Sequence, residues 1–139
     1  MALLFTVQSL SAADEEKEEE PQEPATISYY QIKPSLVADL ASGGKYIRCD
    51  IQLMTKDEAF LEDLKLHGPA IRHTLLLLLS EQDGKTIKTP EGKEALRKKA
   101  LSQVNKLMKE QAGKAGLDAL FFTTFFVQYK KNTPGRPTN

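Results

Sequence analysis

Two histidines and a single cysteine are the first residues to consider for chemistry in this chain. His67 and His73 are six residues apart, whereas metal-binding pairs on one helix are usually three or four apart. Cys49 has no second cysteine for a disulfide and no further ligand at zinc-like spacing. We interpret Cys49 as a small buried hydrophobic residue rather than a nucleophile.

Two aspartates complete the set of candidate catalytic residues. Asp39 and Asp50 fall on neighbouring expected strands and could approach each other, but no nucleophile or base stands beside them in sequence. An enzyme of unrecognised type would depend on Asp50 with His67 or His73, in a pocket that unites them. No G-x-S-x-G, P-loop or G-x-G-x-x-G motif is present. We therefore expect no catalytic residue, no metal site and no cofactor.

The charge of the chain is zero overall but unevenly distributed. Residues 14–24 hold seven acidic residues against one lysine, a net of −6, and the rest of the chain holds 12 acidic and 18 basic residues, a net of +6. The acidic segment is either a solvated linker or a tail that screens a basic face of the domain or of a partner. The basic run of residues 97–99 lacks the interleaved aromatics of single-strand binders, so we interpret it as a solvated helix face and expect no nucleic-acid partner.

The first 13 residues are apolar and then small and polar, which is typical of the end of a secretory signal peptide. No Lys or Arg precedes the apolar run, so we interpret residues 1–13 as a truncated signal peptide; a frayed apolar tail is the alternative. The run is too short to span a bilayer. Residues 14–26 are Glu- and Pro-rich and predict a disordered linker. A genuine signal would place the protein in the periplasm.

Alternating hydrophobicity predicts two strands at the start of the domain. Residues 27–40 alternate with a break expected at Pro34, because proline cannot donate to a strand ladder. Residues 45–54 alternate most clearly, with Tyr46 and Arg48 on the polar face. The turn signal at residues 42–44 joins the two segments, which should pair antiparallel.

Three helices are expected in the middle of the chain. Thr55 to Glu58 form a capping-box pattern for a helix that ends near Leu66. Gly68 suits a left-handed C′ position, and a second helix with five consecutive leucines, residues 75–79, runs to about Glu81. Thr89, Pro90 and Glu91 begin the longest helix, which ends at the glycines of residues 113 and 116.

The last strand is expected at residues 117–129, and its two faces are both apolar. Phe122 and Phe126 share one parity of this strand. A strand that is apolar on both faces is central in a sheet or is covered by a partner. The order β-β-α-α-α-β predicts a two-layer α+β domain over residues 27–129, followed by a flexible tail at 130–139.

Four stretches of the chain recur together in a known family. They are Tyr30–Leu40 with Lys45–Arg48, His67–His73 with the leucines to Ser80, Thr89–Arg97, and Phe121–Gln128. In this order and spacing, from about Tyr29 to Gln128, they resemble the FliL family of flagellar basal-body proteins. Two departures are the absence of the usual N-terminal transmembrane helix and the aspartate at Asp39, where the family often has asparagine.

This resemblance implies a non-enzymatic periplasmic domain, similar in fold to stomatin-like (SPFH) domains, at or near the inner membrane. It implies partners among the stator and basal-body proteins, assembly into a homo-oligomeric ring, and support of swimming or swarming. A periplasmic SPFH-like scaffold or adaptor unrelated to the flagellum is the alternative. We expect the partner contacts on the closing strand, the leucine-rich helix and the polar face of the second strand; the candidate residues are Tyr46, Arg48, Leu76, Leu77, Phe122 and Phe126.

Overall fold

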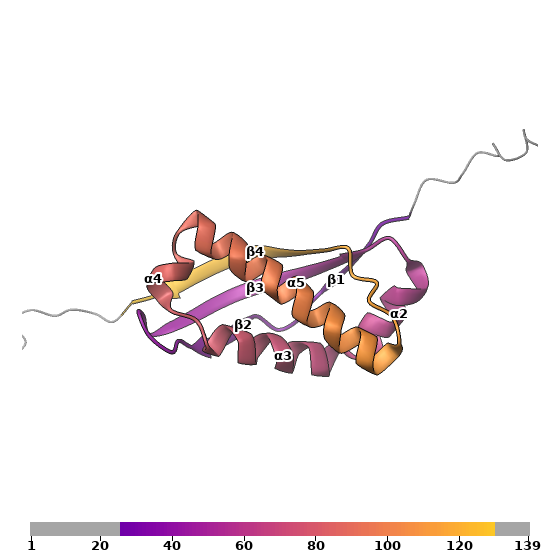
Figure 1. The fold of residues 1–139 in the computed structure, drawn as a ribbon, viewed down its shortest axis with the longest axis horizontal. Coiled ribbons are helices and arrows are strands. Elements are labelled where there is room, and N and C mark those ends of the chain that lie inside the picture. The colour runs from indigo at the N-terminus through magenta and orange to yellow at the C-terminus, as the bar shows by residue number, and fades with distance from the viewer. Residues whose placement is uncertain (1–25, 130–139) are drawn as a thin grey trace, which may run out of the picture.

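The computed structural model describes residues 26–129, which form a four-stranded sheet with helices packed on one of its faces (Figure 1). The strands are β1 (Ser28–Gln31), β2 (Leu36–Asp39), β3 (Tyr46–Thr55) and β4 (Ala119–Gln128). The helices are α2 (Glu58–Leu66), α3 (Gly68–Ser80), α4 (Gly84–Ile87) and α5 (Pro90–Ala112). The expected α+β class is confirmed. The order differs from the prediction, because the first extended segment forms two strands and because α4 follows the turn at Asp83.

β3 is the central strand, and every pairing in the sheet is antiparallel. β1 pairs with the last four residues of β3 and β2 pairs with its first four, so these two short strands follow one another along the same edge. The predicted antiparallel pairing and the break near Pro34 are confirmed. The described chain enters where Ser28 faces Thr55 and leaves at the opposite end of the sheet, where Gln128 faces Tyr46 (Figure 1).

β4 is an edge strand, so the first of the two alternatives predicted for it, a central position, is wrong; the second, cover by a partner, stays a prediction. β4 pairs with β3 over nearly its whole length, and no other strand of the described residues pairs with it. The alternation expected along it is also wrong, because the register shifts at Asp50 and Ile51 of β3 and leaves Thr123 of β4 without a partner. Such a β-bulge reverses which residues face the core.

The core lies between the helices and the covered face of the sheet. β3 contributes Ile47, Cys49, Ile51 and Leu53, all fully buried. The remaining large buried side chains come mostly from the helices and include Phe60, Leu64, Ile71, Leu75, Leu78, Leu79, Ile87, Val104 and Met108. The five-leucine run is therefore only partly internal: Leu76 is half-buried against the core and Leu77 is 52% exposed.

The start of α2 differs from the predicted capping box. Asp57 is the N-cap, and its carboxylate accepts from the backbone N–H groups of Ala59 (2.9 Å) and Phe60 (3.3 Å). Thr55 is fully buried, and its hydroxyl donates to the carbonyl of Gly116 at 2.8 Å. Thr55 thus ties the end of β3 to the segment before β4 instead of capping the helix.

Gly68 is the first residue of α3 and does not adopt the left-handed C′ conformation expected for it. A Cβ at this position would lie 2.5 Å from the hydroxyl oxygen of Tyr30. Glycine here leaves room for the hydroxyl end of a β1 side chain, whereas the expected role of Pro69 in the first turn is confirmed.

α5 has the predicted ends. The Thr89 hydroxyl accepts from the backbone N–H of Gly92 at 3.0 Å, and Gly113 is the left-handed C-cap with φ 78°. Asn105 fixes the return to β4, because its amide donates to the carbonyl of Leu117 (3.0 Å) and accepts from the N–H of the same residue (2.9 Å).

The predictions of a signal peptide at 1–13, of an acidic linker at 14–26 and of a tail at 130–139 concern segments outside the described residues, Thr26 apart. Within residues 26–129, no helix combines the length and the apolar character needed to cross a bilayer.

Candidate functional site: the open face of the sheet

One face of the sheet is left uncovered by the described helices, and we call it the open face. Along β3 the side chains alternate between fully buried residues on the helical side and partly or largely exposed ones on the open face. The open face is formed by Tyr29, Gln31, Val37, Asp39, Tyr46, Arg48, Asp50, Gln52, Met54, Phe121, Thr124, Phe126 and Gln128. Because the helices cover only one face of the sheet, the other face is available for a partner.

The open face carries several large apolar side chains. Tyr29 is 53% exposed, Val37 52%, Phe126 50% and Phe121 39%. Exposed aromatic residues on one surface are typical of protein–protein contact sites, where they supply contact area at low entropic cost.

The bulge at Thr123 is what places two phenylalanines on each side of β4. Before the bulge, Phe122 faces the core and Phe121 the open face; after it, Phe125 faces the core and Phe126 the open face. The inward pair packs edge to face, with ring centroids 5.0 Å apart. Both apolar parities of β4 are thereby used, one in the core and one at the surface.

Tyr46, Arg48 and Phe126 form one cluster on the open face, at the end of the sheet where β3 begins and β4 finishes. Arg48 is exposed and is the cross-strand partner of Phe126. The rings of Tyr46 and Phe126 are tilted by 58° with centroids 6.4 Å apart. Tyrosine, phenylalanine and arginine are enriched at the centres of protein interfaces. The structure thus brings together three of the six residues that the sequence indicated as partner contacts.

The other three candidate residues lie elsewhere. Phe122 packs against the core from the covered face. Leu76 and Leu77 lie on α3 in the helical layer, on the far side of the sheet from the open face. Simple alternation predicted that Phe122 and Phe126 share one face of β4. They lie on opposite faces, because the bulge between them reverses the alternation.

Asp50 anchors a polar network on the open face. Its carboxylate accepts from the hydroxyls of Ser35 (2.5 Å) and Thr124 (2.7 Å), and so it joins the loop between β1 and β2 to β4. These hydrogen bonds, Ser35 first, hold the pKa of Asp50 below its ordinary value, with Arg48 adding to the effect. All of these partners favour a carboxylate that is ionised and held in place.

Arg72 of α3 holds the same loop from the helical side. Its guanidinium donates to the carbonyls of Pro34 (2.5 Å) and Ser35 (3.2 Å). The stretch Pro69–Arg72 therefore has a structural role, because its arginine fixes the loop between β1 and β2.

The structure does not bring the candidate catalytic residues together. Asp50 lies on the open face, whereas His67 and His73 lie in the helical layer at the start of α3 and along it. Asp39 faces Tyr46, four residues from Asp50 along β3, which is about 13 Å at 3.3 Å per residue. Within the described part of the chain, no three His, Cys, Asp or Glu side chains form a group that could hold a metal ion.

The side chain of Cys49 in β3 points into the core and is fully buried, as the sequence predicted. Burial, with a smaller contribution from the charge of Asp50, raises the pKa of its thiol to about 12. Such a thiol carries almost no thiolate near neutral pH and is a poor nucleophile.

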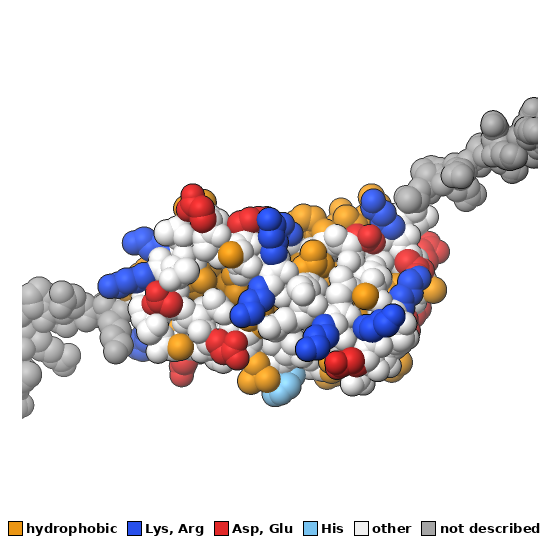
Figure 2. Space-filling model, in the orientation of Figure 1, with side chains coloured by type: hydrophobic (Ala, Val, Ile, Leu, Met, Phe, Trp, Pro, Cys, Tyr) orange, Lys and Arg blue, Asp and Glu red, His pale blue; other side chains and the backbone are white. Residues whose placement is uncertain are grey.

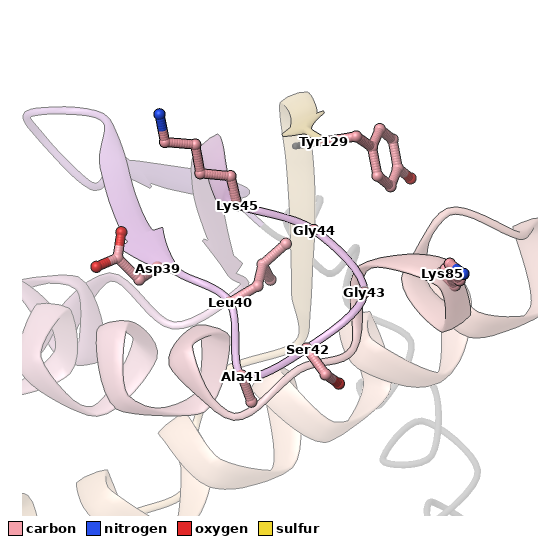
Figure 3. A pocket seen from close by; sticks show the side chains of 9 residues that line it. All are labelled: Asp39, Leu40, Ala41, Ser42, Gly43, Gly44, Lys45, Lys85 and Tyr129. Carbon is pink, nitrogen blue, oxygen red and sulfur yellow. The ribbon is translucent and has the colours of Figure 1, made fainter. Parts of the chain in front are cut away.

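A hollow of about 620 Å³ lies at the hairpin between β2 and β3 (Figure 3). Its charged side chains are Asp39, Lys45 and Lys85, and they point away from one another rather than toward a common point. The remaining lining residues are small or apolar, apart from Tyr129 and Ser42. The Ser42 hydroxyl donates to the carboxylate of Asp83 at 3.2 Å, but hydrogen bonds from Thr86 and Ser42 lower the pKa of Asp83, which makes that carboxylate a weak base.

Sequence reasoning did not indicate Tyr29, Val37 or Phe121 as surface residues. A signal existed for the first two, since each is an apolar residue on the otherwise polar parity of residues 27–40. Phe121 gave no such signal, because its orientation depends on the bulge two residues later.

Comparison with known proteins identifies close similarities over the whole described domain. A family model described as "Flagellar basal body-associated protein FliL" matches residues 29–128. The "Flagellar protein FliL" of Aquifex aeolicus (strain VF5) is 29% identical over 101 residues, which are 71% of this chain and 60% of that protein. The chain thus spans less than two thirds of the length of this relative.

Proposed function

Since the chain belongs to the FliL family of flagellar basal body-associated proteins, we propose that it is a non-enzymatic accessory of the flagellar motor that acts through protein contacts on its open face. The observation that supports this function most is the extent of the family match, residues 29–128, which includes every described strand and helix except Ser28. The proposal includes action in the periplasm, near the inner membrane, and a contribution to swimming or swarming.

The open face is the contact surface in this proposal. Phe126 is half exposed, and an aromatic side chain carries roughly 200 Å² of surface, so a partner could bury about 100 Å² more. At about 25 cal/mol per Å², this one residue would contribute about 2.5 kcal/mol before the costs of association. Tyr46 and Arg48 stand beside it and would extend the contact.

The partners in this proposal are basal-body proteins, with the stator among them, and further copies of this chain in a ring. A fold related to stomatin-like (SPFH) domains is part of the same proposal, and the two-layer α+β architecture is consistent with it. Leu76 and Leu77 of α3, which the sequence also indicated, lie on the other layer and form the competing contact site, outside the contact surface proposed here; Leu77 is exposed to nearly the same extent as Phe126.

Leu77 therefore provides a matched control for a test of the open face. The gene would be deleted in the source bacterium and replaced by the wild type, Phe126→Ser or Leu77→Ser, with swimming speed and swarm expansion measured under normal and high load. We expect the deletion to impair motility, Phe126→Ser to reproduce most of the loss, and Leu77→Ser to be tolerated. Thermal melting of both purified variants checks that each still folds.

Unchanged motility of the deletion strain at all loads would contradict the proposed function itself. Loss of motility with Leu77→Ser but not with Phe126→Ser would keep the function and move the contact to α3.

A further inference from the structure

The free edge of β4 offers backbone groups for pairing. The carbonyl of Ile51 accepts from the N–H of Ile32 at 2.9 Å, so the odd-numbered residues of β3 direct their backbone groups toward β1 and β2. Their cross-strand partners in β4 must then direct N–H and C=O away from β3. By the observed register these residues are Leu120, Phe122, Phe125 and Val127.

This edge is long for an unprotected strand. β4 has ten residues, and natural proteins normally shorten, charge or cover such an edge. Among residues 26–129, one side chain occupies a free backbone group of this edge: Arg97 of α5 donates to the carbonyl of Leu120 at 3.3 Å. The Arg97 side chain is 27% exposed, and at 3.3 Å its hydrogen bond is long, so a better-aligned backbone donor can replace it.

A groove accompanies the edge, between β4 and the segment that includes α4 and the start of α5. It consists of two hollows of about 320 and 330 Å³, which share Lys93. The first is lined by Phe121 and Phe122 of β4, the second by Phe125 and Val127. Figure 2 shows hydrophobic side chains at the margin of the molecule where β4 runs in Figure 1, with Lys and Arg side chains beside them.

The rim of the groove is positively charged. The ammonium group of Lys93 lies 4.7 Å from the ring centre of Phe125, and that of Lys88 lies 5.6 Å from the ring centre of Tyr129. Neither lysine forms an ion pair with any residue between 26 and 129. Arg97 pairs with Glu94, so the rim keeps a net positive charge.

We propose that this groove binds an extended, acidic segment of another protein, which adds to β4 as a further strand. Strand addition to a sheet edge beside a helix supplies affinity through main-chain hydrogen bonds and selectivity through alternate side chains. Side chains on one face of the added strand recur about every 7 Å, and apolar ones would enter the two hollows. Carboxylates on the same face, two residues from the apolar ones, would meet Lys88, Lys93 and Arg97, which line the same hollows. This surface meets the open face at Phe121, which belongs to both, but its other lining residues lie on the helical side of β4, and the proposal does not depend on the proposed function.

Charge and composition favour such a partner over two nearer occupants. A second copy joined through β4 would bring the lysines of both rims together, which is repulsive. The chain's own acidic segment, residues 14–24, has the right charge but contains two prolines and no apolar residue to fill the hollows.

The test uses the full chain and a fluorescent ten-residue peptide, measured by anisotropy, in which valine and glutamate follow one another at every second position and threonine fills the positions between them, so that valine and glutamate share one face. Two N-methylated versions of the peptide distinguish strand addition from non-specific binding. One is methylated at the odd-numbered backbone nitrogens and the other at the even-numbered ones. We expect one pattern to abolish binding and the other to leave it nearly unchanged, because only one edge of the peptide faces β4. A peptide with lysine in place of glutamate should bind at least tenfold more weakly.

Protein variants locate the site. Lys93→Glu should weaken binding about tenfold or more, whereas Lys98→Glu, the same charge change on an exposed α5 position outside the groove, should have little effect. Equal binding of both N-methylated peptides, or equal effects of the two lysine variants, would overturn the proposal. Absence of peptide binding would also overturn the proposal. If the β4 amides of the free protein are then found to be protected from hydrogen exchange, the edge is already occupied. A monomer in sedimentation would mean that the chain itself occupies it, and a dimer would mean that a second copy does.

Discussion

Replacing Gly92 by alanine should destabilise this domain, although the same change stabilises most helices. Gly92 lies in the first turn of α5, and a Cβ there would lie 1.9 Å from the carbonyl oxygen of Thr86 and 2.7 Å from its carbon. Real Cβ contacts below 3.0 Å essentially do not occur. The turn and the helix would therefore have to separate by at least about 1 Å.

That separation has a cost that can be worked out from the contacts. The Thr86 carbonyl accepts from the Thr89 hydroxyl at 2.9 Å and from the Thr89 N–H at 3.3 Å, and the same hydroxyl caps Gly92. Two hydrogen bonds at about 1 kcal/mol each and a weakened N-cap at about 1 kcal/mol give about 3 kcal/mol. Removing a helical glycine returns up to about 1 kcal/mol. The net loss is about 2 kcal/mol, or roughly 10 °C in Tm for a domain of this size.

Urea and thermal unfolding of the purified protein, followed by circular dichroism, would measure this loss. Ala95→Gly is the matched control, because Ala95 is exposed one turn further along α5 and reports the helix propensity alone. We expect Ala95→Gly to cost about 1 kcal/mol. A Gly92→Ala variant as stable as the wild type, or more stable, would refute the close contact between Gly92 and Thr86.

Three further predictions follow from single residues. Cys49, with its pKa raised to about 12 by burial, should not react with a thiol reagent at pH 8 until urea unfolds the domain; rapid labelling of the native protein would contradict its burial. Hydrogen bonds lower the pKa of Asp50 in the folded protein. The contribution of its carboxylate to the stability of the fold is therefore complete above the pKa of an unfolded aspartate, about 4, and is lost as the pH falls through the lower pKa of the folded state. Asp50→Asn should therefore lower the urea midpoint at pH 7 and reduce its decline in acid, and an unaltered pH profile would exclude this role. Asn105→Ala should cost about 2 kcal/mol in urea unfolding, since it removes two hydrogen bonds to the backbone of Leu117, and an unchanged midpoint would mean that water replaces the amide.

Features encoded by neighbouring residues could be predicted from the sequence. The N-cap at Thr89, the proline after it and the left-handed C-cap at Gly113 are local signals, and the structure confirms them. The alternation of β3 is equally local, and its buried parity, with Cys49 in it, is as predicted.

Features that depend on distant contacts could not be predicted in this way. The Thr55 hydroxyl bonds to a carbonyl 61 residues away, so the cap falls to Asp57. Gly68 lies against the hydroxyl of Tyr30, a residue of another element, instead of taking the left-handed conformation that the local sequence suggested. The register shift opposite Asp50 has no mark in the sequence of β4, and it alone decides which phenylalanines reach the open face.

The path of the chain through the sheet determines how the domain would bear a mechanical load. β1 begins at the end of β3 marked by Thr55, and β4 finishes at the end marked by Tyr46. A pull between residues 26 and 129 therefore runs along the strands and shears the β1–β3 and β3–β4 ladders, so that their hydrogen bonds are strained together rather than opened one after another. A load applied at the two ends of residues 26–129 would thus be carried by both ladders at once.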